Sequence, residues 1–347
     1  MKIKAWFLMG SILGGLLLQG CTINDTNKDT GQYGVDSGME EQVQDENGDT
    51  TKVIGLSVDQ EFDSRIGVTT AIKESAAEKG YMILEFIAEG DAQTQNIQIE
   101  ELVELEVDSI LVCAVDQDEI EESLVLAEEA GIPIVAFDRD LPNSISIDAY
   151  VGPDSLYDGK ICGEALVEAL EDVLQTEETI YVLELVGALN DQNGIDRSKG
   201  WNEVLENIPQ IEVIQMPTDW DEDSAAEATQ NAFQAVSDIK AVFCSTDSFV
   251  PYVNEVLTKL GLTTLVGEEN HIFINGVNGS SDGYQAVIAG EIDGFMVMNL
   301  EEVGITAVEL ADKLMKGEEV DKITLVESTY YTHETAEINS GLIWGAE

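Results

Sequence analysis

Short apolar runs rich in β-branched residues alternate, from Lys52 onward, with longer acidic segments whose apolar residues recur at helical spacing. Continuous apolar runs indicate strands covered on both faces, and their alternation with helices indicates βαβ units and parallel sheets. We therefore expect strands at residues 53–58, 81–88, 109–114, 132–138, 179–187, 211–217, 241–246, 271–277 and 294–300.

Two of the intervening segments show the buried face of a helix, because their apolar residues lie three and four positions apart. These stripes are Ile161, Ala165, Leu166, Ala169, Leu170 and Val173 in one segment, and Val303, Ala307, Leu310 and Leu314 in the other. Nine strands are many for one sheet in a chain of 347 residues. Two α/β lobes fit better, with a seam near Tyr150–Pro153.

The N-terminus differs from the rest of the chain. Two lysines precede an apolar run at residues 5–18, which is short for a membrane-spanning helix and typical of a secretory signal. The run ends in LLQGC, which resembles a bacterial lipobox, although Gln19 is an unusual residue there. The resemblance implies a signal peptide at 1–20 and a lipid on Cys21 as the membrane anchor; an ordinary cleaved signal with an incidental cysteine is the alternative.

Residues 21–51 are polar and acidic and lack periodicity, so we expect a flexible tether. The formal net charge of −53 repels phosphate backbones and argues against a nucleic-acid partner, and surface solubility explains it most simply. Cys113, Cys162 and Cys244 are odd in number and widely spaced. They indicate buried free thiols and neither a disulfide framework nor a zinc site.

Polar or aromatic residues follow most of the predicted strands, and ligands of open parallel sheets bind beyond the carboxyl ends of strands. Acids, amides, arginines and aromatics together suit a sugar, because planar polar groups hold hydroxyls while aromatic rings pack on the C–H face. For single residues a cap or turn is the alternative, above all for Asp247, and Asp138 and Arg139 could simply pair with each other. The candidates are Phe62, Arg65, Asp138, Arg139, Asp191, Asn193, Trp220, Thr246, Asp247, Asn278 and Asn299.

Over about residues 52–330 the chain resembles the type I periplasmic sugar-binding proteins, the ribose-, xylose- and galactose-binding group that serves ABC transporters. The resemblance implies two Rossmann-like α/β lobes with parallel sheets around a hinged ligand cleft, a monomer, and no cofactor. It implies one lobe from 52–152 plus about 300–330 and another from 153–299 plus about 331–347. The stretches that carry it are GIPIVAFDRD (131–140), DRSKGW (196–201), AVFCSTDSFVPYV (241–253) and FINGVNGSSDGYQAVIAGEIDG (273–294).

The resemblance also implies roles for single residues. Asp138 and Arg139 match an acid–arginine pair that holds sugar hydroxyls, and Trp220 falls where ribose-binding members carry a stacking aromatic. Asn299 falls at a polar hinge position that also touches ligand. Arg65 lies near the position where xylose-binding members place an arginine in the first loop.

The chain departs from the family at several of these positions. Thr246 stands where many members have asparagine, and Asn278 where many have aspartate. The ligand-facing arginine of ribose-binding members falls on Ile195, whereas Arg197 matches an arginine next to the start of the helix. These departures indicate a pocket rebuilt for another polyol, sugar or sugar-like molecule.

An enzyme is the contrasting class of function. Neither His271 nor His333 lies in a nucleophile motif, although the many carboxylates leave a glycosidase conceivable. DWDED (219–223) looks like the start of a calcium loop, but Ser224 and Gln230 replace the glycine and glutamate that such a loop needs, so we expect no metal site.

Two further alternatives share the fold. A transcription regulator would need a helix-turn-helix and a basic surface, which the signal sequence and the acidic body argue against. A sensor could present its ligand to a chemoreceptor, to a histidine kinase or to an autoinducer-2 type system. We expect an extracytoplasmic lipid-anchored protein that delivers a sugar or polyol to an ABC permease.

Overall fold

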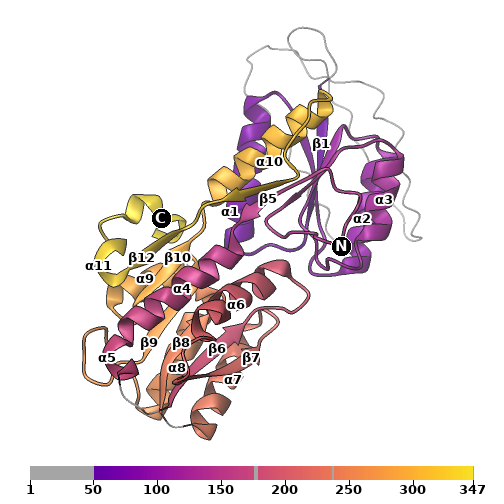
Figure 1. Ribbon diagram of the computed structural model, residues 1–347. Coiled ribbons are helices and arrows are strands. Elements are labelled where there is room, and N and C mark those ends of the chain that lie inside the picture. Colours follow the sequence, from indigo (N-terminus) through magenta and orange to yellow (C-terminus); the bar gives the residue numbers. More distant parts are fainter. Residues whose placement is uncertain (1–50, 176–178, 237, 347) are drawn as a thin grey trace, which may run out of the picture. The chain divides into compact units, whose positions relative to one another are not determined.

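The computed structural model describes residues 51–175, 179–236 and 238–346 (Figure 1). The predicted signal peptide (1–20) and Cys21 lie outside these residues, as does the predicted tether apart from Thr51. Residues 53–347 form one compact unit. Within the described ranges, no helix combines the length and the apolarity that a membrane crossing requires.

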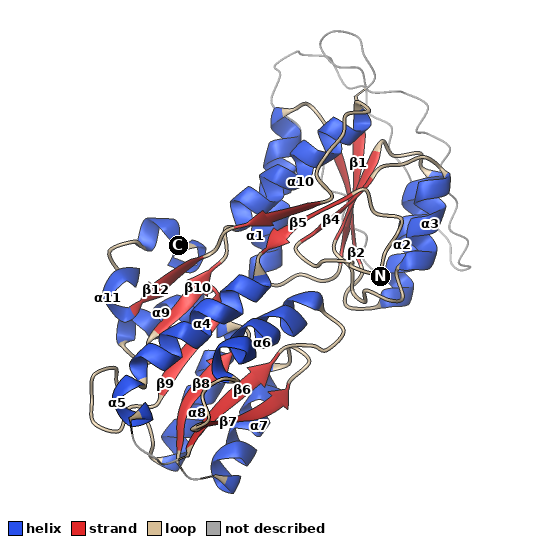
Figure 2. Ribbon diagram, viewed as in Figure 1, coloured by secondary structure: helices blue, strands red, loops and turns tan. Residues whose placement is uncertain are grey.

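A first six-stranded sheet is parallel throughout, in the order β11-β5-β4-β3-β1-β2 (Figure 2). Helices bury apolar residues on both of its faces, as the continuous apolar strands require. The strands are β1 (Val53–Val58), β2 (Met82–Ile87), β3 (Ser109–Val112), β4 (Ile134–Phe137), β5 (Ala149–Pro153) and β11 (Ile323–Val326). The helices are α1 (Asp63–Glu78) and α10 (Leu300–Met315) on one face, and α2 (Ala92–Glu104) and α3 (Glu121–Glu129) on the other.

A second six-stranded sheet has the order β12-β10-β9-β8-β6-β7, and only the edge strand β12 runs antiparallel to its neighbour. Its strands are β6 (Ile180–Val186), β7 (Ile211–Pro217), β8 (Ile239–Cys244), β9 (Phe273–Asn278), β10 (Gly294–Val297) and β12 (Thr329–Thr332). The helices are α4 (Ser155–Ala169) and α6 (Gln192–Leu205) on one face, and α7 (Glu222–Ala235), α8 (Val250–Leu260) and α9 (Ser281–Ala289) on the other. The short helices α5 (Glu171–Leu174) and α11 (His333–Ala336) complete this lobe.

The predicted fold class, two α/β lobes with mostly parallel sheets, is confirmed, and all nine predicted strands are present. Three strands were not predicted. β5 contains a glycine and a proline, which are uncommon in strand interiors. β11 and β12 are four-residue edge strands with partly exposed side chains, so neither forms a continuous apolar run.

The prediction of buried helical stripes is more accurate for α10 than for the segment of α4 and α5. Val303, Ala307 and Leu310 are buried in α10 as predicted. In the other segment Leu166 is buried, but α4 ends at Ala169 and Val173 lies in the separate helix α5, where it is only partly buried. The periodic spacing continued past the end of the helix.

The chain passes between the two lobes at three connections, β5 to α4, β10 to α10 and β11 to β12. Asp154 lies in the first, Met298 and Asn299 in the second, and Glu327 and Ser328 in the third. Because the first two connections follow the carboxyl ends of β5 and β10, the loops that follow parallel strands in each lobe lie close to the place where the lobes meet.

Candidate functional site

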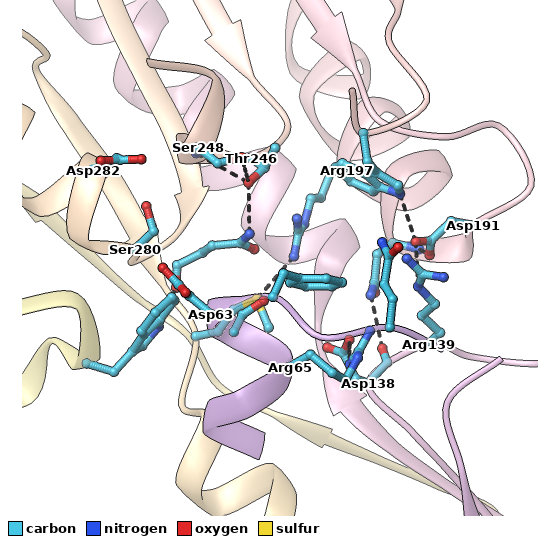
Figure 3. A pocket seen from close by; sticks show the side chains of 18 of the residues that line it. Asp63, Arg65, Asp138, Arg139, Asp191, Arg197, Thr246, Ser248, Ser280 and Asp282 are labelled. Carbon is cyan, nitrogen blue, oxygen red and sulfur yellow. Dashed lines mark hydrogen bonds and ion pairs between the residues drawn. The ribbon is translucent and has the colours of Figure 1, made fainter. Parts of the chain in front are cut away.

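A cavity of about 340 Å³ lies beyond the carboxyl ends of the parallel strands of both sheets (Figure 3). Its wall combines carboxylates, guanidinium groups, amides, hydroxyls and aromatic rings. The lining residues are Gln60, Phe62, Asp63, Ser64, Arg65, Asp138, Arg139, Asp191, Asn193, Arg197, Trp220, Glu222, Thr246, Ser248, Asn278, Ser280, Asp282, Met298 and Trp344.

A network of arginines and carboxylates forms the wall of the first lobe. Arg65 on α1 is 2% exposed, and its Nε lies 2.7 Å from Asp59 Oδ1, while its Nη1 pairs with Asp138. Burial by itself would lower the pKa of Arg65, but Asp138 and Asp59 raise it well above the ordinary value. For Asp138, burial acts to raise the pKa, and the charge of Arg65 outweighs burial and lowers it. Both groups therefore stay charged and fixed in place.

Arg139 and Asn193 reach across from one lobe to the other. Arg139, at the end of β4, places Nη1 3.2 Å from Asp59 Oδ2 and Nε 2.9 Å from Asp191 Oδ2 on the second lobe. In the opposite direction, Asn193 Nδ2 of α6 donates to the backbone oxygen of Asp138 at 3.0 Å. The alternative in which Asp138 and Arg139 simply pair with each other does not apply, since each is bound to other partners.

Trp220 and Arg197 form the wall of the second lobe. The indole Nε1 of Trp220 donates to Asp191 Oδ2 at 3.0 Å, and the Arg197 guanidinium lies 5.9 Å from the centre of a Trp220 ring. The ring lies over the end of β6 because Gly187 has no side chain; a Cβ there would be 2.2 Å from it. Glycine at this position thus makes room for the aromatic surface.

The side of the cavity near β8 and β9 presents hydroxyl and amide groups. Asn278 Nδ2 donates to Thr246 Oγ1 at 2.9 Å. Trp344, from the C-terminal segment, donates its indole N–H to the backbone oxygen of Asn278 at 2.8 Å. Trp344 therefore joins Phe62 and Trp220 as a third aromatic residue in the lining of the cavity.

Three lining residues have left-handed backbone conformations that non-glycine residues rarely adopt: Asp138 (φ 62°), Trp220 (φ 60°) and Asn278 (φ 126°). Such conformations persist where the surrounding structure enforces them, and they concentrate at binding sites. Asp138 directly follows β4, Asn278 ends β9, and Trp220 lies in the loop three residues after β7, so in each case the backbone after a strand turns a side chain into the cavity.

The structure brings nine of the eleven predicted site residues together in this cavity. They are Phe62, Arg65, Asp138, Arg139, Asp191, Asn193, Trp220, Thr246 and Asn278.

The other two candidates, Asp247 and Asn299, do not line the cavity. Asp247 is fully buried, and its Oδ2 accepts hydrogen bonds from the Gly279 and Ser280 amides at 2.7 and 2.9 Å, which holds the loop between β9 and α9. Asn299 is exposed and caps α10 by accepting from the Glu302 amide. Both residues are used for local backbone structure.

Arg197 is the main lining residue that the sequence analysis left out of its candidates. Asn193 and Arg197 are four positions apart on α6, so they share a face of the helix, and this spacing could have identified Arg197. Nothing local predicts Trp344, since it is brought to β9 by the path of the C-terminal segment.

Three carboxylates, Asp63, Glu222 and Asp282, line the cavity without an ion pair to any described cation. Burial and then the charges of Glu222 and Asp63 raise the pKa of Asp282. Among the described residues, no group of three or more His, Cys, Asp or Glu side chains is arranged to hold a metal ion. The cavity thus offers hydrogen bonds and aromatic surface to a small polar molecule.

Known proteins resemble this chain over most of its length. It is 22% identical to the ribose import binding protein of Haemophilus influenzae, over 72% of this chain and 80% of that protein. It is 27% identical to the galactofuranose-binding protein of Escherichia coli K12, over 77% of this chain and 83% of that protein. These relatives are binding proteins by name, not enzymes.

Solved structures share the fold. A galactofuranose-binding protein superposes with a TM-score of 0.75 at 24% identity, covering 84% of this chain and 98% of that one. An ABC transporter solute-binding protein of Bacillus halodurans with bound myo-inositol also superposes with a TM-score of 0.75. It is 23% identical to this chain, and the match covers 85% of this chain and 99% of that one. The family model described as the periplasmic binding protein domain matches residues 53–319. This chain therefore belongs to the periplasmic binding protein family.

Proposed function

We propose that this protein is an extracytoplasmic solute-binding protein that captures a sugar or sugar-like polyol between its lobes and delivers it to an ABC permease. One observation carries the proposal: a single cavity is lined from both lobes by fixed charged groups, amides, hydroxyls and aromatic rings. Closure would bring together the lobe of residues 52–152 plus about 300–330 and the lobe of 153–299 plus about 331–347.

The polar wall suits hydroxyl groups. A hydroxyl both donates and accepts, so it can bridge a carboxylate and a guanidinium such as those of Asp138 and Arg139. Phe62 and Trp220 offer rings on which the C–H face of a sugar packs. Because Arg65 and Arg139 already pair with carboxylates, the site favours an uncharged ligand over an anion. Relatives named for ribose, galactofuranose and xylitol support a small polyhydroxylated ligand.

We further propose that the mature chain is held at the cell membrane by a lipid on Cys21, with residues 22–51 as a tether to the binding lobes. The basic and apolar leader that ends in LLQGC motivates this part of the proposal.

A thermal-shift screen of the purified full chain against pentoses, hexoses, xylitol and myo-inositol tests the ligand. A true ligand present at a hundred times its Kd stabilises the protein by about 2.7 kcal/mol. If no carbohydrate or polyol raises the unfolding temperature, the proposed function is wrong. Ribitol and glucuronate serve as a neutral and an anionic comparison, and we expect any shift to be confined to uncharged compounds.

A further inference from the structure

A buried carboxyl group outside the cavity wall, Asp158, lies next to the binding site. It is fully buried on α4. Its Oδ2 accepts a hydrogen bond from Ser328 Oγ at 3.2 Å, whereas its Oδ1 has no hydrogen-bond partner within the described chain. A buried polar atom without a partner is uncommon and calls for an explanation.

Arg197, which lines the cavity, has a matching unused donor. It is 3% exposed, and its Nη1 donates to the Ser245 backbone oxygen at 2.8 Å. Its Nη2 has the Met298 sulfur at 3.1 Å, and its Nε has no partner among the described residues. A thioether is a weak acceptor, so one edge of a buried guanidinium lacks a strong one.

Asp158 and Arg197 are neighbours without being an ion pair. The backbones of α4 and α6 touch at this level, since a Cβ on Gly159 would lie 2.1 Å from the Arg197 carbonyl oxygen. No ion pair joins the Asp158 carboxyl to Arg197. The free oxygen of one residue and the free N–H of the other are therefore available to approach each other.

The same two residues contact two of the three connections between the lobes. Met298, beside the Arg197 guanidinium, belongs to the connection between β10 and α10, and Ser328, bound to Asp158, to the connection between β11 and β12. A shift of Arg197 toward or away from Asp158 would change both contacts together. The cavity wall at Arg197, the Asp158 carboxyl and the two connections thus form one contiguous set of groups.

We infer that Asp158 is a positioning residue for ligand capture: as a carboxylate it draws Arg197 away from the cavity, and in its neutral form it leaves Arg197 to the ligand. Protonation of Asp158 then favours ligand binding, and by linkage ligand binding favours protonation. The inference rests on the proposed function, because it requires a ligand that binds beside Arg197.

The surroundings of Asp158 place the protonation of its carboxylate near neutral pH. Burial raises the pKa of Asp158 to about 7, against the opposing influence of Arg197 and the Ser328 hydrogen bond, while Asp154 adds to the rise. The strands that also pack on α4, β9 and β10, carry no charged residue. Cys162, one turn further along α4, stays a neutral thiol because burial raises its pKa well above the ordinary value.

The direction of the pH effect follows from these groups. Below the pKa, Asp158 is neutral and the ligand binds more tightly; above it, the carboxylate competes for Arg197 and the ligand binds more weakly. Asp158→Asn keeps the shape of the neutral form, so its affinity should stay high at all pH values. Ser328→Ala removes a hydrogen bond that favours the carboxylate, and it should move the midpoint of the profile to higher pH.

The test is isothermal titration of the full chain with D-galactose, L-arabinose, xylitol and myo-inositol, at several values from about pH 6 to about pH 8. The parent protein should lose affinity about fivefold or more across this range, a normal size for coupling between sites. The profile of Asp158→Asn should be flat. Asp154→Asn is the matched control next to α4, since asparagine keeps the cap of the helix. It removes a charge that adds to the rise of the Asp158 pKa, so it should keep the pH dependence of the parent with a midpoint at slightly lower pH.

The inference is overturned if a probe binds and Asp158→Asn follows the same pH profile as the parent, or if the profile of the parent is flat. In either case the proposed function stands. Binding of no carbohydrate or polyol, in this titration or in the thermal-shift screen, would instead refute the proposed function, and the inference would fail with it. Thermal unfolding of the unliganded variants checks that the Asn and Ala substitutions leave the fold intact.

Discussion

Replacement of Arg139 by alanine should weaken ligand binding about tenfold to a hundredfold while leaving the protein folded. The guanidinium makes three contacts in different directions: to Asp59 Oδ2 at 3.2 Å, to Asp191 Oδ2 at 2.9 Å and to the Ala114 backbone oxygen at 3.0 Å. The contact with Asp191 joins the two lobes at the cavity. Arg139 therefore positions both walls of the site.

The expected loss of stability is moderate, because neither carboxylate is left without a partner. Asp59 keeps the Arg65 Nε at 2.7 Å, and Asp191 keeps the Trp220 indole N–H at 3.0 Å. Removing one member of an isolated buried ion pair costs about 3–5 kcal/mol. Here the loss should be closer to that of hydrogen bonds to charged groups, about 1.5–3 kcal/mol.

The substitution should also weaken ligand binding, and this loss of affinity reduces the stabilisation that the ligand gives. Hydrogen bonds from the guanidinium to ligand hydroxyls contribute about 1.5–3 kcal/mol, which corresponds to about a tenfold to a hundredfold change in Kd. A ligand concentration that stabilises the parent by about 2.7 kcal/mol would then stabilise Arg139→Ala by only about 0.4–1.4 kcal/mol.

Differential scanning fluorimetry with and without the sugar identified in the screen measures both quantities. Arg139→Lys is an informative companion, because a lysine keeps the charge but cannot reach three acceptors at once. Lys73→Ala is the control, since it removes a more exposed ion pair with Glu85, and neither residue belongs to the cavity lining. It should change neither the stability nor the ligand-induced stabilisation by more than about 1 kcal/mol. A full ligand-induced shift in Arg139→Ala would show that Arg139 serves structure alone.

Three further changes test other parts of the structure. Gly187→Ala places a Cβ 2.2 Å from the Trp220 ring, so it should displace the ring and weaken ligand binding in a titration, with retained binding arguing against the role of Trp220. Burial raises the pKa of Asp247 to about 6. The charged form of Asp247 therefore lowers the free energy of unfolding, with no effect below about pH 4 and the full effect above about pH 6. Asp247→Asn removes this effect, because asparagine carries no charge. The unfolding free energy of that variant, measured with urea, should rise relative to the parent by at most about 3 kcal/mol across this window, and a constant difference would contradict the assigned titration. Cys21→Ser should release the protein from the membrane fraction on immunoblots, whereas unchanged retention would count against the lipid anchor.

The sequence predicted the fold because the relevant signals are local. A strand buried on both faces must be a continuous apolar run, and the alternation of such runs with helical segments leaves few arrangements other than parallel sheets. The same rule located most of the site, since residues such as Asp138 and Trp220 follow the carboxyl ends of strands, where ligands of open sheets bind. Strands without that pattern, β11 and β12, were missed.

Only the tertiary structure decided which strand-end residues line the cavity and which partners they have. Thr246 and Asp247 are adjacent in the sequence, yet one lines the cavity and the other is buried beneath the loop that follows β9. Arg197 lines the cavity although it was not among the predicted site residues, and Trp344 arrives from the C-terminal segment. There are two physical reasons. The backbone conformation of one residue after a strand changes the direction of the next side chain by a large angle. The hydrogen-bond and ion-pair partners of that side chain come from segments that are distant in the sequence. The periodicity of apolar residues in the sequence predicts neither the direction of such a side chain nor its partners.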